Sequence, residues 1–335
     1  MQVYSVINKI EKKYPIEMII AESLPVWQFL RNVYADKLHK MYFSKDSKSP
    51  NRISNITNTL SNVLWEKKNR SQHYPAVLFT DVLEERPIHG LISDKLAHNI
   101  LPILKEEILV VLDPLEGRHK SVSEYFHSEY LSIYSFVFSA KFKKKKIKIE
   151  NSQILDEIER EISLNIPYEK LVNQFFQYAA VFQHWIRKTN PKVIFINCFF
   201  SLRHQALIYS AKKNNIITAE LQHGIISKAQ TAYMPQKKMG KHSFPDYLLS
   251  FGELEKTLVS PYFVSSEKII PIGNYYLENL LSKNNNPHPE KIISSLRRTF
   301  KRVILISSQK LIEHDLILFL SEAAEKLSDT VFILV

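Results

Sequence analysis

The feature that most constrains the fold is the segment from Pro191 to Ser227, which reads as a strand, a helix and a second strand. Residues 193–196 form a continuous apolar run, 202–214 have helical spacing, and 216–221 form another short apolar run. An unbroken apolar run is typical of a strand that is covered on both faces. The alternation continues in a strand at 247–250, a short helix near 253–260 and a strand at 268–270. This order predicts an α/β fold with a parallel, doubly wound sheet.

We also predict strands in the first half of the chain. Residues 76–80 and 108–112 are short, apolar and closed by Asp81 and Asp113, as expected of buried strands. We expect another strand within 128–139. Helical spacing marks four segments, at 26–38, 51–66, 152–164 and 168–188.

The length of 335 residues suits two domains. We predict a Rossmann-like N-terminal domain with extra helices at 1–283, and the start of a second Rossmann-like domain at 284–335. The second domain would begin with a basic helix, followed by a strand at 303–306, a helix at 311–327 and a strand at 331–335. Because the sequence stops inside this last strand, we expect the second domain to be incomplete here, truncated or completed by a partner, and the chain alone to be inactive.

Cysteine content and hydropathy exclude several classes of protein. Cys198 is the only cysteine, so an intramolecular disulfide and a multi-cysteine metal site are both excluded. No run of 18 apolar residues and no secretory signal is found, and we expect a cytoplasmic protein. No His, Asp or Glu spacing is typical of a zinc or calcium site, and nothing requires Mg²⁺.

The net charge of +11 favours an anionic partner, and its densest run extends from Lys141 to Lys148. Lysines at a strand or loop edge block unwanted strand pairing, which is one explanation. The other is peripheral contact with an anionic membrane, at the inner face of the cytoplasmic membrane. Nucleic acid is disfavoured because no recognition motif accompanies the charge.

Glycines are rare, and three of the six immediately follow predicted strands: Gly224, Gly252 and Gly273. Glycine is needed where φ is positive or where a ligand approaches the backbone closely. Ligands of open α/β sheets bind beyond the carboxyl ends of the strands, so these glycines predict one wall of a cleft. Tight turns are the alternative. The dinucleotide and P-loop glycine motifs are both absent.

The loop Gln222-His223-Gly224 is the strongest site marker, because it places an imidazole at a strand end beside a glycine. Such a histidine can act as a general base toward a hydroxyl or donate to a phosphate oxygen. A structural histidine that caps the strand is the alternative. Asp113 at another strand end is a second candidate for the base.

From 190 to 275 the chain resembles bacterial surface-polysaccharide glycosyltransferases of the GT-B type, which have two Rossmann-like domains. The resemblance rests on 191–196, on 218–226 with Gln222-His223-Gly224, on Ser250-Phe251-Gly252-Glu253 and on Ile272-Gly273-Asn274. Trp27 and Arg31 also resemble the W-x-x-x-R opening of capsule and lipopolysaccharide proteins.

This resemblance implies transfer of a sugar from a nucleotide-sugar donor to a growing polysaccharide or lipid-linked acceptor, without a further cofactor. The His-Gly pair is also similar to that of teichoic-acid glycerophosphotransferases, which implies that His223 is catalytic. Donor phosphates would contact Gly224, Gly252, Gly273, Asn274, Ser307, Ser308 and Gln309. The acceptor side would include Arg31, His89 and Asp94. The alternative explanations are a surface ion pair for Arg31 and a solvated loop for His89 and Asp94.

Two other functions fit the same residues. A nucleotide-sugar epimerase of this fold would need no acceptor, and incubation with the donor alone separates it from a transferase. A non-catalytic glycan- or membrane-surface assembly protein is the third hypothesis.

Overall fold

The structure is a computed structural model that describes residues 3–43, 58–59, 61–65, 73–88, 90–115, 117–143, 146–282, 287–307 and 313–334. The chain divides into two compact units. The first holds Met1–Lys40 and Lys48–Tyr276, and the second holds Met41–Ser47 and Leu277–Val335. The division falls within helix α10, Tyr275–Ser282, near the boundary predicted after residue 283.

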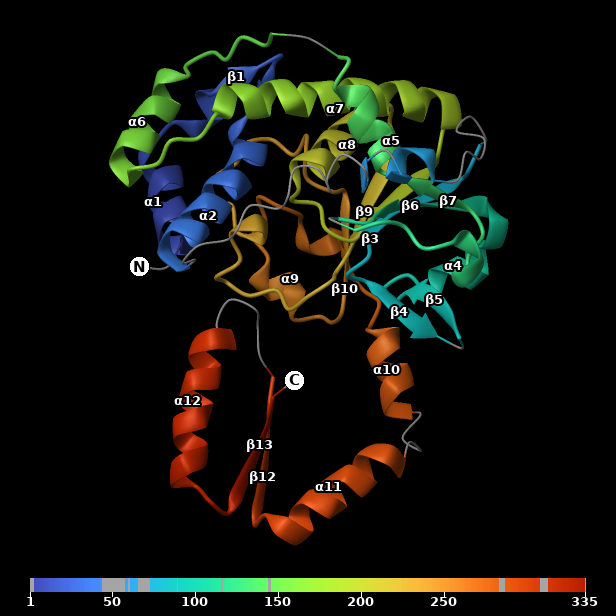
Figure 1. Cartoon of the computed structure of the whole chain (residues 1–335). Helices are drawn as coiled ribbons and strands as arrows, with labels where there is room; N and C mark the ends of the chain where they lie inside the picture. Colours follow the sequence, from blue (N-terminus) through green and yellow to red (C-terminus); the bar gives the residue numbers. More distant parts are fainter. Residues whose placement is uncertain are drawn as a thin grey trace. The chain divides into compact units, whose positions relative to one another are not determined.

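A seven-stranded sheet with the order β11-β10-β9-β8-β3-β6-β7 organises the first unit (Figure 1). Every neighbouring pair is parallel, which confirms the predicted α/β fold with a parallel sheet. The strands are β3 (Ala76–Asp81), β6 (Ile108–Asp113), β7 (Tyr130–Ser132), β8 (Val193–Ile196), β9 (Ile217–Leu221), β10 (Tyr247–Ser250) and β11 (Ile269–Pro271).

The strand order defines where the direction of winding changes. From β3 the chain adds β6 and β7 on one side, and then β8, β9, β10 and β11 on the other. The carboxyl ends of β3 and β8 therefore flank the point where a doubly wound sheet places its ligand crevice.

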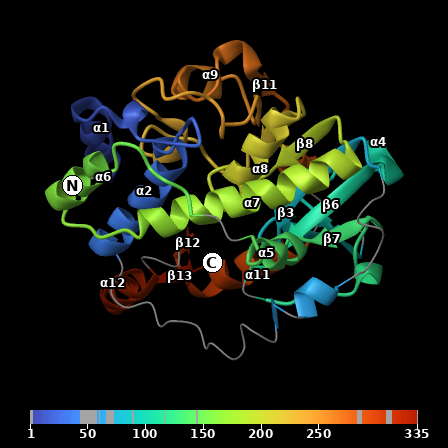
Figure 2. The ribbon, with the colours of Figure 1, turned by 90° about the horizontal axis from the view of Figure 1, so that it is seen from above.

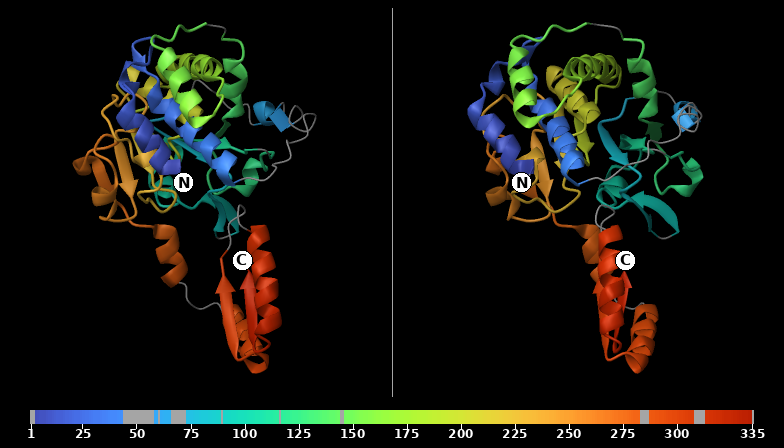
Figure 3. Two further views of the ribbon diagram at one scale, coloured as in Figure 1. Left: turned by 90° about the vertical axis from the view of Figure 1, so that its left-hand side faces the viewer. Right: turned by 60° about the vertical axis from the view of Figure 1, so that its left-hand side comes forward.

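Helices bury one face of the sheet under the larger apolar core. The long helix α7 passes over β3 and β6 beside α8, with α5 near β7 (Figure 2). Views from the side show α1, α2 and α6 gathered beside α7 (Figure 3). These helices are α1 (Val3–Lys13), α2 (Trp27–Phe43), α5 (Tyr134–Ala140), α6 (Gln153–Ile162), α7 (Tyr168–Thr189) and α8 (Leu202–Lys213).

A smaller core covers the opposite face, where Ala76, Leu78 and Val110 pack against Leu101 of α4, Ile100–Leu104. An antiparallel hairpin of β4 (Glu85–Ile88) and β5 (Leu91–Asp94) follows β3. Short elements complete the unit: β1 (Ile20–Ala21), β2 (Leu24–Pro25), α9 (Glu255–Leu258), and 3-10 helices at Ile16–Met18, Lys105–Glu107, Val122–Glu124, Thr231–Tyr233 and Ser266–Lys268.

The second unit begins with most of α10 and contains α11, Pro287–Thr299, and α12, Glu313–Lys326. Its strands β12, Arg302–Ile306, and β13, Thr330–Leu334, pair in parallel, so the expected strand–helix–strand unit is present. Leu305 is 67% exposed, so part of the apolar surface of β12 faces solvent.

One predicted element is confirmed only in part. The strand expected within 128–139 is the short strand β7 followed by helix α5. Short runs of aromatic and apolar residues do not distinguish a strand from one or two turns of buried helix. Helix α1 and the β4–β5 hairpin were not predicted, and of the helix expected at 51–66 only 58–59 and 61–65 lie within the described residues.

Candidate functional site

Polar side chains of β3 and β8 meet where the winding direction changes. Asn197 follows β8, and its side-chain amide donates to Thr80 Oγ1 at 3.2 Å and to Asp81 Oδ2 at 3.4 Å. Asn197 Oδ1 is buried and has no hydrogen-bond partner among the described residues. The ends of the two strands are thus joined side by side, and one amide oxygen is left to receive a donor.

Two carboxylates lie on adjacent strand ends, because Asp81 and Asp113 are paired in register. Burial raises the pKa of Asp81, and the neighbouring charges of Glu84 and Asp113 raise it further. Asp113 Oδ2 instead accepts from Arg203 Nη2 at 2.6 Å, and its Oδ1 accepts from the amide of Leu115. This ion pair makes Asp113 less available as a base, so Asp81 is the stronger candidate of the two.

His223 follows β9 and lies near the same cluster. Burial lowers the pKa of its imidazole, while the charges of Glu84 and Asp81 and the carbonyl of Asn197 act in the opposite direction. Its Nδ1 atom is buried without a partner among the described residues. The ring is therefore neutral at pH 7, with a nitrogen lone pair or N–H that no described protein group engages.

Gln222 holds the loop of His223 in place. Its side-chain amide donates to the carbonyl of Gly224 and to Glu255 Oε1 of α9, both at 2.9 Å, and its Oε1 accepts from the amide of Phe251 at 2.6 Å. This buried side chain thereby ties the ends of β9 and β10 together. These bonds hold the backbone on either side of the loop that carries His223.

The predicted glycines differ in their roles. Gly273 has a φ of 78°, which a glycine adopts readily. Gly224 and Gly252 do not have positive φ, so their backbone conformations are also open to other residues. A Cβ built on Gly224 meets nothing within 4 Å, which leaves open space beside His223. At Gly252 the nearest atom is Glu255 Oε2 at 3.8 Å.

A small cavity brings several of the predicted residues together. Gln222, Phe251, Gly273 and Asn274 line it, together with Lys95 from the turn after β5. Its volume of about 20 Å³ suffices for about one water molecule. Of the three glycines predicted to form the wall of a cleft, Gly273 lines this cavity, and the cavity is too small for a nucleotide sugar.

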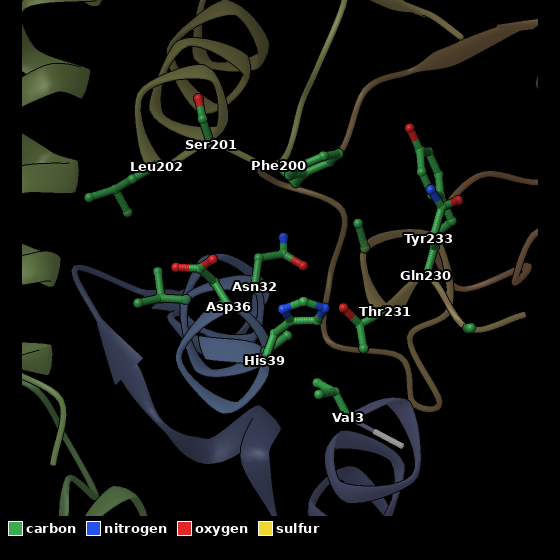
Figure 4. A pocket seen from close by; sticks show the side chains of 14 residues that line it. Val3, Asn32, Asp36, His39, Phe200, Ser201, Leu202, Gln230, Thr231 and Tyr233 are labelled. Atoms are coloured by element: carbon green, nitrogen blue, oxygen red, sulfur yellow. The ribbon is translucent and has the colours of Figure 1, made fainter. Parts of the chain in front are cut away.

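A larger pocket of about 530 Å³ lies beside α2, and Phe200 is one of the residues that line it (Figure 4). The ring of Phe200 lines this pocket and stands 5.8 Å from the ring of His223, centroid to centroid. Both side-chain atoms of the Asn32 amide are buried and without a partner among the described residues. The α2 pocket, as we call it, is lined by Val3, Asn32, Val33, Ala35, Asp36, His39, Phe200, Ser201, Leu202, Ala229, Gln230, Thr231, Ala232 and Tyr233.

A buried acid lies behind the α2 pocket. Tyr233 lines the pocket and donates from its hydroxyl to Glu220 Oε1 at 2.9 Å, where Glu220 is completely buried on β9. Burial raises the pKa of Glu220 to about 8, and the hydrogen bond from Tyr233 only partly opposes this. Glu220 is therefore largely protonated at neutral pH.

The residues predicted for the acceptor side are not gathered in one place. Arg31 is completely buried, where its Nε donates to Glu11 Oε1 at 2.7 Å, so it is neither a surface ion-pair partner nor open to a ligand in this conformation. Asp94 is buried as well, and accepts from Thr80 and from the amides of Leu96 and Ala97. Burial raises the pKa of Asp94 to about 6. His89 lies outside the described residues.

The residues predicted to contact donor phosphates in the second unit are only partly described. Ser307 is exposed after β12, and Ser308 and Gln309 lie outside the described residues. Within the part of the chain that the structure describes, no three His, Cys, Asp or Glu side chains form a group that could hold a metal ion. No described helix is both long enough and apolar enough to cross a membrane.

Sequence reasoning missed Asn197, Asn32 and Phe200. A signal for Asn197 exists, because it is the first residue after a predicted buried strand, like Asp113 and Gln222. Asn32 lies inside a helix and Phe200 in an apolar loop. Their shared pocket depends on packing between segments that are far apart in the chain.

Comparisons with known proteins find similar solved structures but assign no family to the chain. No protein-family model and no curated protein matches the chain. Among solved structures it is similar to a UDP-GlcNAc 2-epimerase from Neisseria meningitidis bound to UDP-GlcNAc, with 11% identity, 77% of this chain and 65% of that chain covered, and a TM-score of 0.39.

Two further epimerase structures give similar values. The Methanocaldococcus jannaschii enzyme in complex with UDP-GlcNAc and UDP has 13% identity, 78% and 66% coverage and a TM-score of 0.37. The Rickettsia bellii enzyme has 11% identity, 78% and 62% coverage and a TM-score of 0.37. The chain spans less than two thirds of the length of these proteins. At such values we rely on the strand order of this sheet, and not on these similarities, for the fold.

Proposed function

We propose that this chain belongs to an enzyme that processes a nucleotide sugar, with His223 as the group that moves a proton. The observation that carries the proposal is the position of His223, whose imidazole lies close to Asp81 and Asn197 where the sheet changes its winding direction. Ligands of doubly wound sheets bind at this point. The unpartnered Nδ1 of His223 and the open space at Gly224 support a reacting group there.

Epimerisation is the first of two reactions that these groups support. When it proceeds by loss of a proton from a stereocentre, an adjacent carbonyl or leaving group takes up the electron pair, and a proton is later added to the opposite face. Such a route needs acid–base groups but no second substrate. His223, with a lowered pKa, and Asp81, with a raised pKa, are two such groups of different chemical type. The lowered pKa favours the neutral, basic form of His223, and the raised pKa favours the protonated form of Asp81.

Glycosyl transfer is the second reaction, and the α2 pocket favours it. An acceptor sugar presents hydroxyl groups, and the pocket offers the Asn32 amide, the Ser201 hydroxyl and the Thr231 hydroxyl beside the ring of Phe200 (Figure 4). His223 would then remove the proton of the attacking hydroxyl. A surface polysaccharide or lipid-linked glycan is the kind of acceptor that we propose.

The two reactions are separated by incubating the protein with UDP-sugars and GDP-sugars alone. Isomerised sugar without acceptor supports epimerisation, and Asn32→Leu should then leave the rate unchanged. Product only with an added glycan acceptor supports transfer, and Asn32→Leu should then raise the KM for the acceptor. A thermal-shift panel of nucleotides shows binding even without turnover, because a ligand of the folded state raises its stability.

His223→Gln tests the role of the histidine in either reaction. Removal of a general base typically slows a reaction by about 10²–10⁴-fold. The matched control is His242→Gln at an exposed histidine. Unchanged turnover by a folded His223→Gln protein, in a preparation that is otherwise active, would refute this role.

A further inference from the structure

A second large cavity lies on the helix-covered face, away from the α2 pocket. It has a volume of about 480 Å³ and is bounded by α5, α7 and the end of β7, which lie together in Figure 2. None of its residues lines the α2 pocket or the small cavity at Gly273. The α5–α7 pocket, as we call it, is lined by Leu131, Ser135, Phe136, Ser139, Lys143, Val181, His184, Trp185 and Lys188.

Two buried polar groups in this pocket lack partners within the described part of the chain. They are the hydroxyl of Ser135, a residue that is 5% exposed, and the indole Nε1–H of Trp185, a residue that is 6% exposed. An indole nitrogen can only donate, and a buried donor without an acceptor costs about 1–3 kcal/mol. Both residues line the cavity, and a ligand whose oxygen atoms reach these two groups would satisfy them.

The rim of the pocket is basic. Lys143, His184 and Lys188 line it and are exposed. Among the described residues, no acidic side chain forms an ion pair with Lys143 or Lys188, whereas several other lysines of the first unit are paired with Asp or Glu. A ligand of the pocket is therefore expected to carry negative charge beside its oxygen atoms.

The residues around the α5–α7 pocket favour a lipid over a small soluble anion as its ligand. Leu131, Phe136 and Val181 form an apolar floor, which phosphate alone would leave uncovered. Beside the pocket, Phe138 and Phe142 contact each other with ring centroids 5.2 Å apart and are 36% and 69% exposed. Exposed aromatic rings among lysines are typical of surfaces that enter the interfacial region of a membrane.

We propose that the α5–α7 pocket binds the phosphate headgroup of an anionic membrane lipid. The phosphate oxygens accept from Ser135 and Trp185, Lys143 and Lys188 neutralise the charge, and Phe138 and Phe142 insert among the acyl chains. The lysines Lys141, Lys146 and Lys148 add general attraction to an anionic surface. This site is independent of the proposed reaction, since its residues do not touch His223 or the α2 pocket.

Vesicle co-sedimentation tests the proposal with phosphatidylcholine vesicles, with and without phosphatidylglycerol. We expect binding only when phosphatidylglycerol is present. Since each basic residue near an anionic surface contributes about 1 kcal/mol, Lys143→Glu with Lys188→Glu should weaken binding by roughly thirtyfold or more. The control is Lys37→Glu with Lys170→Glu, which changes the net charge equally at exposed positions outside the pocket. Equal loss in both double variants would overturn the pocket in favour of diffuse charge attraction.

Fluorescence quenching by a brominated phosphatidylglycerol tests the indole directly. Emission of the wild-type protein should be quenched, and Trp185→Phe should remove the quenched component while keeping an aromatic ring in the core. Inorganic phosphate is the comparison for a soluble ligand. The opposing outcome is that phosphate raises the melting temperature of the wild type but not that of Trp185→Phe, while neither protein binds vesicles. In that case the pocket is a site for a soluble anion and the lipid proposal is wrong.

Discussion

His223 is set apart from a surface histidine by its burial and by the carboxylates near it. Burial is the largest effect and lowers its pKa below the ordinary value of 6.5. The ring is then a neutral base at pH 7 and becomes protonated only as the pH falls below 6.5. We expect turnover to fall on the acid side of this value. A pH–rate profile with an acid limb above pH 6.5 would contradict the assignment.

Glu220 provides a prediction about stability rather than activity. Its pKa of about 8 in the folded protein exceeds the ordinary 4.5, so the folded state holds a proton that the unfolded state loses between these values. Stability contributed by this group is complete below about pH 4.5 and is lost as the pH rises toward 8. Glu220→Gln should therefore melt at a higher temperature than the wild type at pH 8 and at about the same temperature at pH 5.

The measurement for Glu220 is thermal unfolding followed by circular dichroism at several pH values. Asp81 and Asp94 also have raised pKa values and contribute a similar slope, so the informative quantity is the difference between the variant and the wild type. A constant difference across the pH range would show that Glu220 does not titrate in this window.

Single residues were predictable from the sequence only where they follow strands. His223 and Asp113 stand at strand ends, and a parallel sheet brings such residues to one edge whatever the remaining packing is. Arg31 was placed on the acceptor side by resemblance, yet its guanidinium is buried against Glu11. Whether a helical arginine faces core or solvent depends on an acidic partner in another helix, which periodicity does not reveal.

At the scale of elements, the ion pair of Arg31 and Glu11 fixes α1 and α2 to the segment 231–236, which is distant in sequence. Glu11 also accepts from Trp27 Nε1 at 3.1 Å and from the amide of Gln236 at 2.8 Å, and Arg31 Nη1 donates to the carbonyl of Thr231. Both charged side chains have no exposed surface. Arg31→Met leaves the carboxylate buried and unpaired, so we expect a loss of about 3–5 kcal/mol in the free energy of unfolding.

Urea unfolding of Arg31→Met measures this loss. Lys40→Met is the control, because its pair with Asp36 is exposed and should contribute less than about 1 kcal/mol. Adding Glu11→Leu to Arg31→Met removes the unpaired charge, and should restore part of the lost stability. A loss for Arg31→Met as small as that of the control would show that the buried charge finds another partner.

Gln222 joins the ends of β9 and β10. We therefore expect its removal to disturb both strand ends as well as the hydrogen bonds that it makes. Gln222→Ala deletes three side-chain hydrogen bonds and leaves the amide of Phe251 and a carboxylate oxygen of Glu255 without this partner. We expect a loss of about 1–3 kcal/mol in stability, and a lower kcat because His223 loses its support. Gln153→Ala at an exposed position is the control in both assays, and equal behaviour would refute the positioning role.

Elements with a short apolar run or a long helical period were predictable almost to the residue, as β8, β10 and the helix α7 show. Their identity depends on local pattern and length. The β4–β5 hairpin and α1 were not predictable in this way. Glu85–Ile88 contains a proline and two charged residues, and the second half of α1 contains three lysines. These elements are stabilised by neighbours that are distant in sequence.

At the scale of the molecule, the buried cores belong to the first unit. Every residue of the two apolar clusters precedes Tyr276 in the chain. In the described part of the second unit, only Leu320 and Thr330 are buried. We expect a fragment of residues 1–276 to unfold cooperatively at about the melting temperature of the whole chain. Calorimetry of both proteins checks this, and a fragment without a cooperative transition would show that the second unit is required for the first to fold.

The position of β3 in the sheet has a consequence for biosynthesis. One edge of this strand pairs with β6, which is translated soon afterwards, while its other edge pairs Ala76 with Val193 of β8. The nascent chain therefore carries a largely apolar strand with an unpaired edge until more than a hundred further residues have left the ribosome. Pairings this distant slow folding and expose the intermediate to association with other chains. We therefore expect β3, at which the winding direction of the finished sheet changes, to need protection by a chaperone during synthesis.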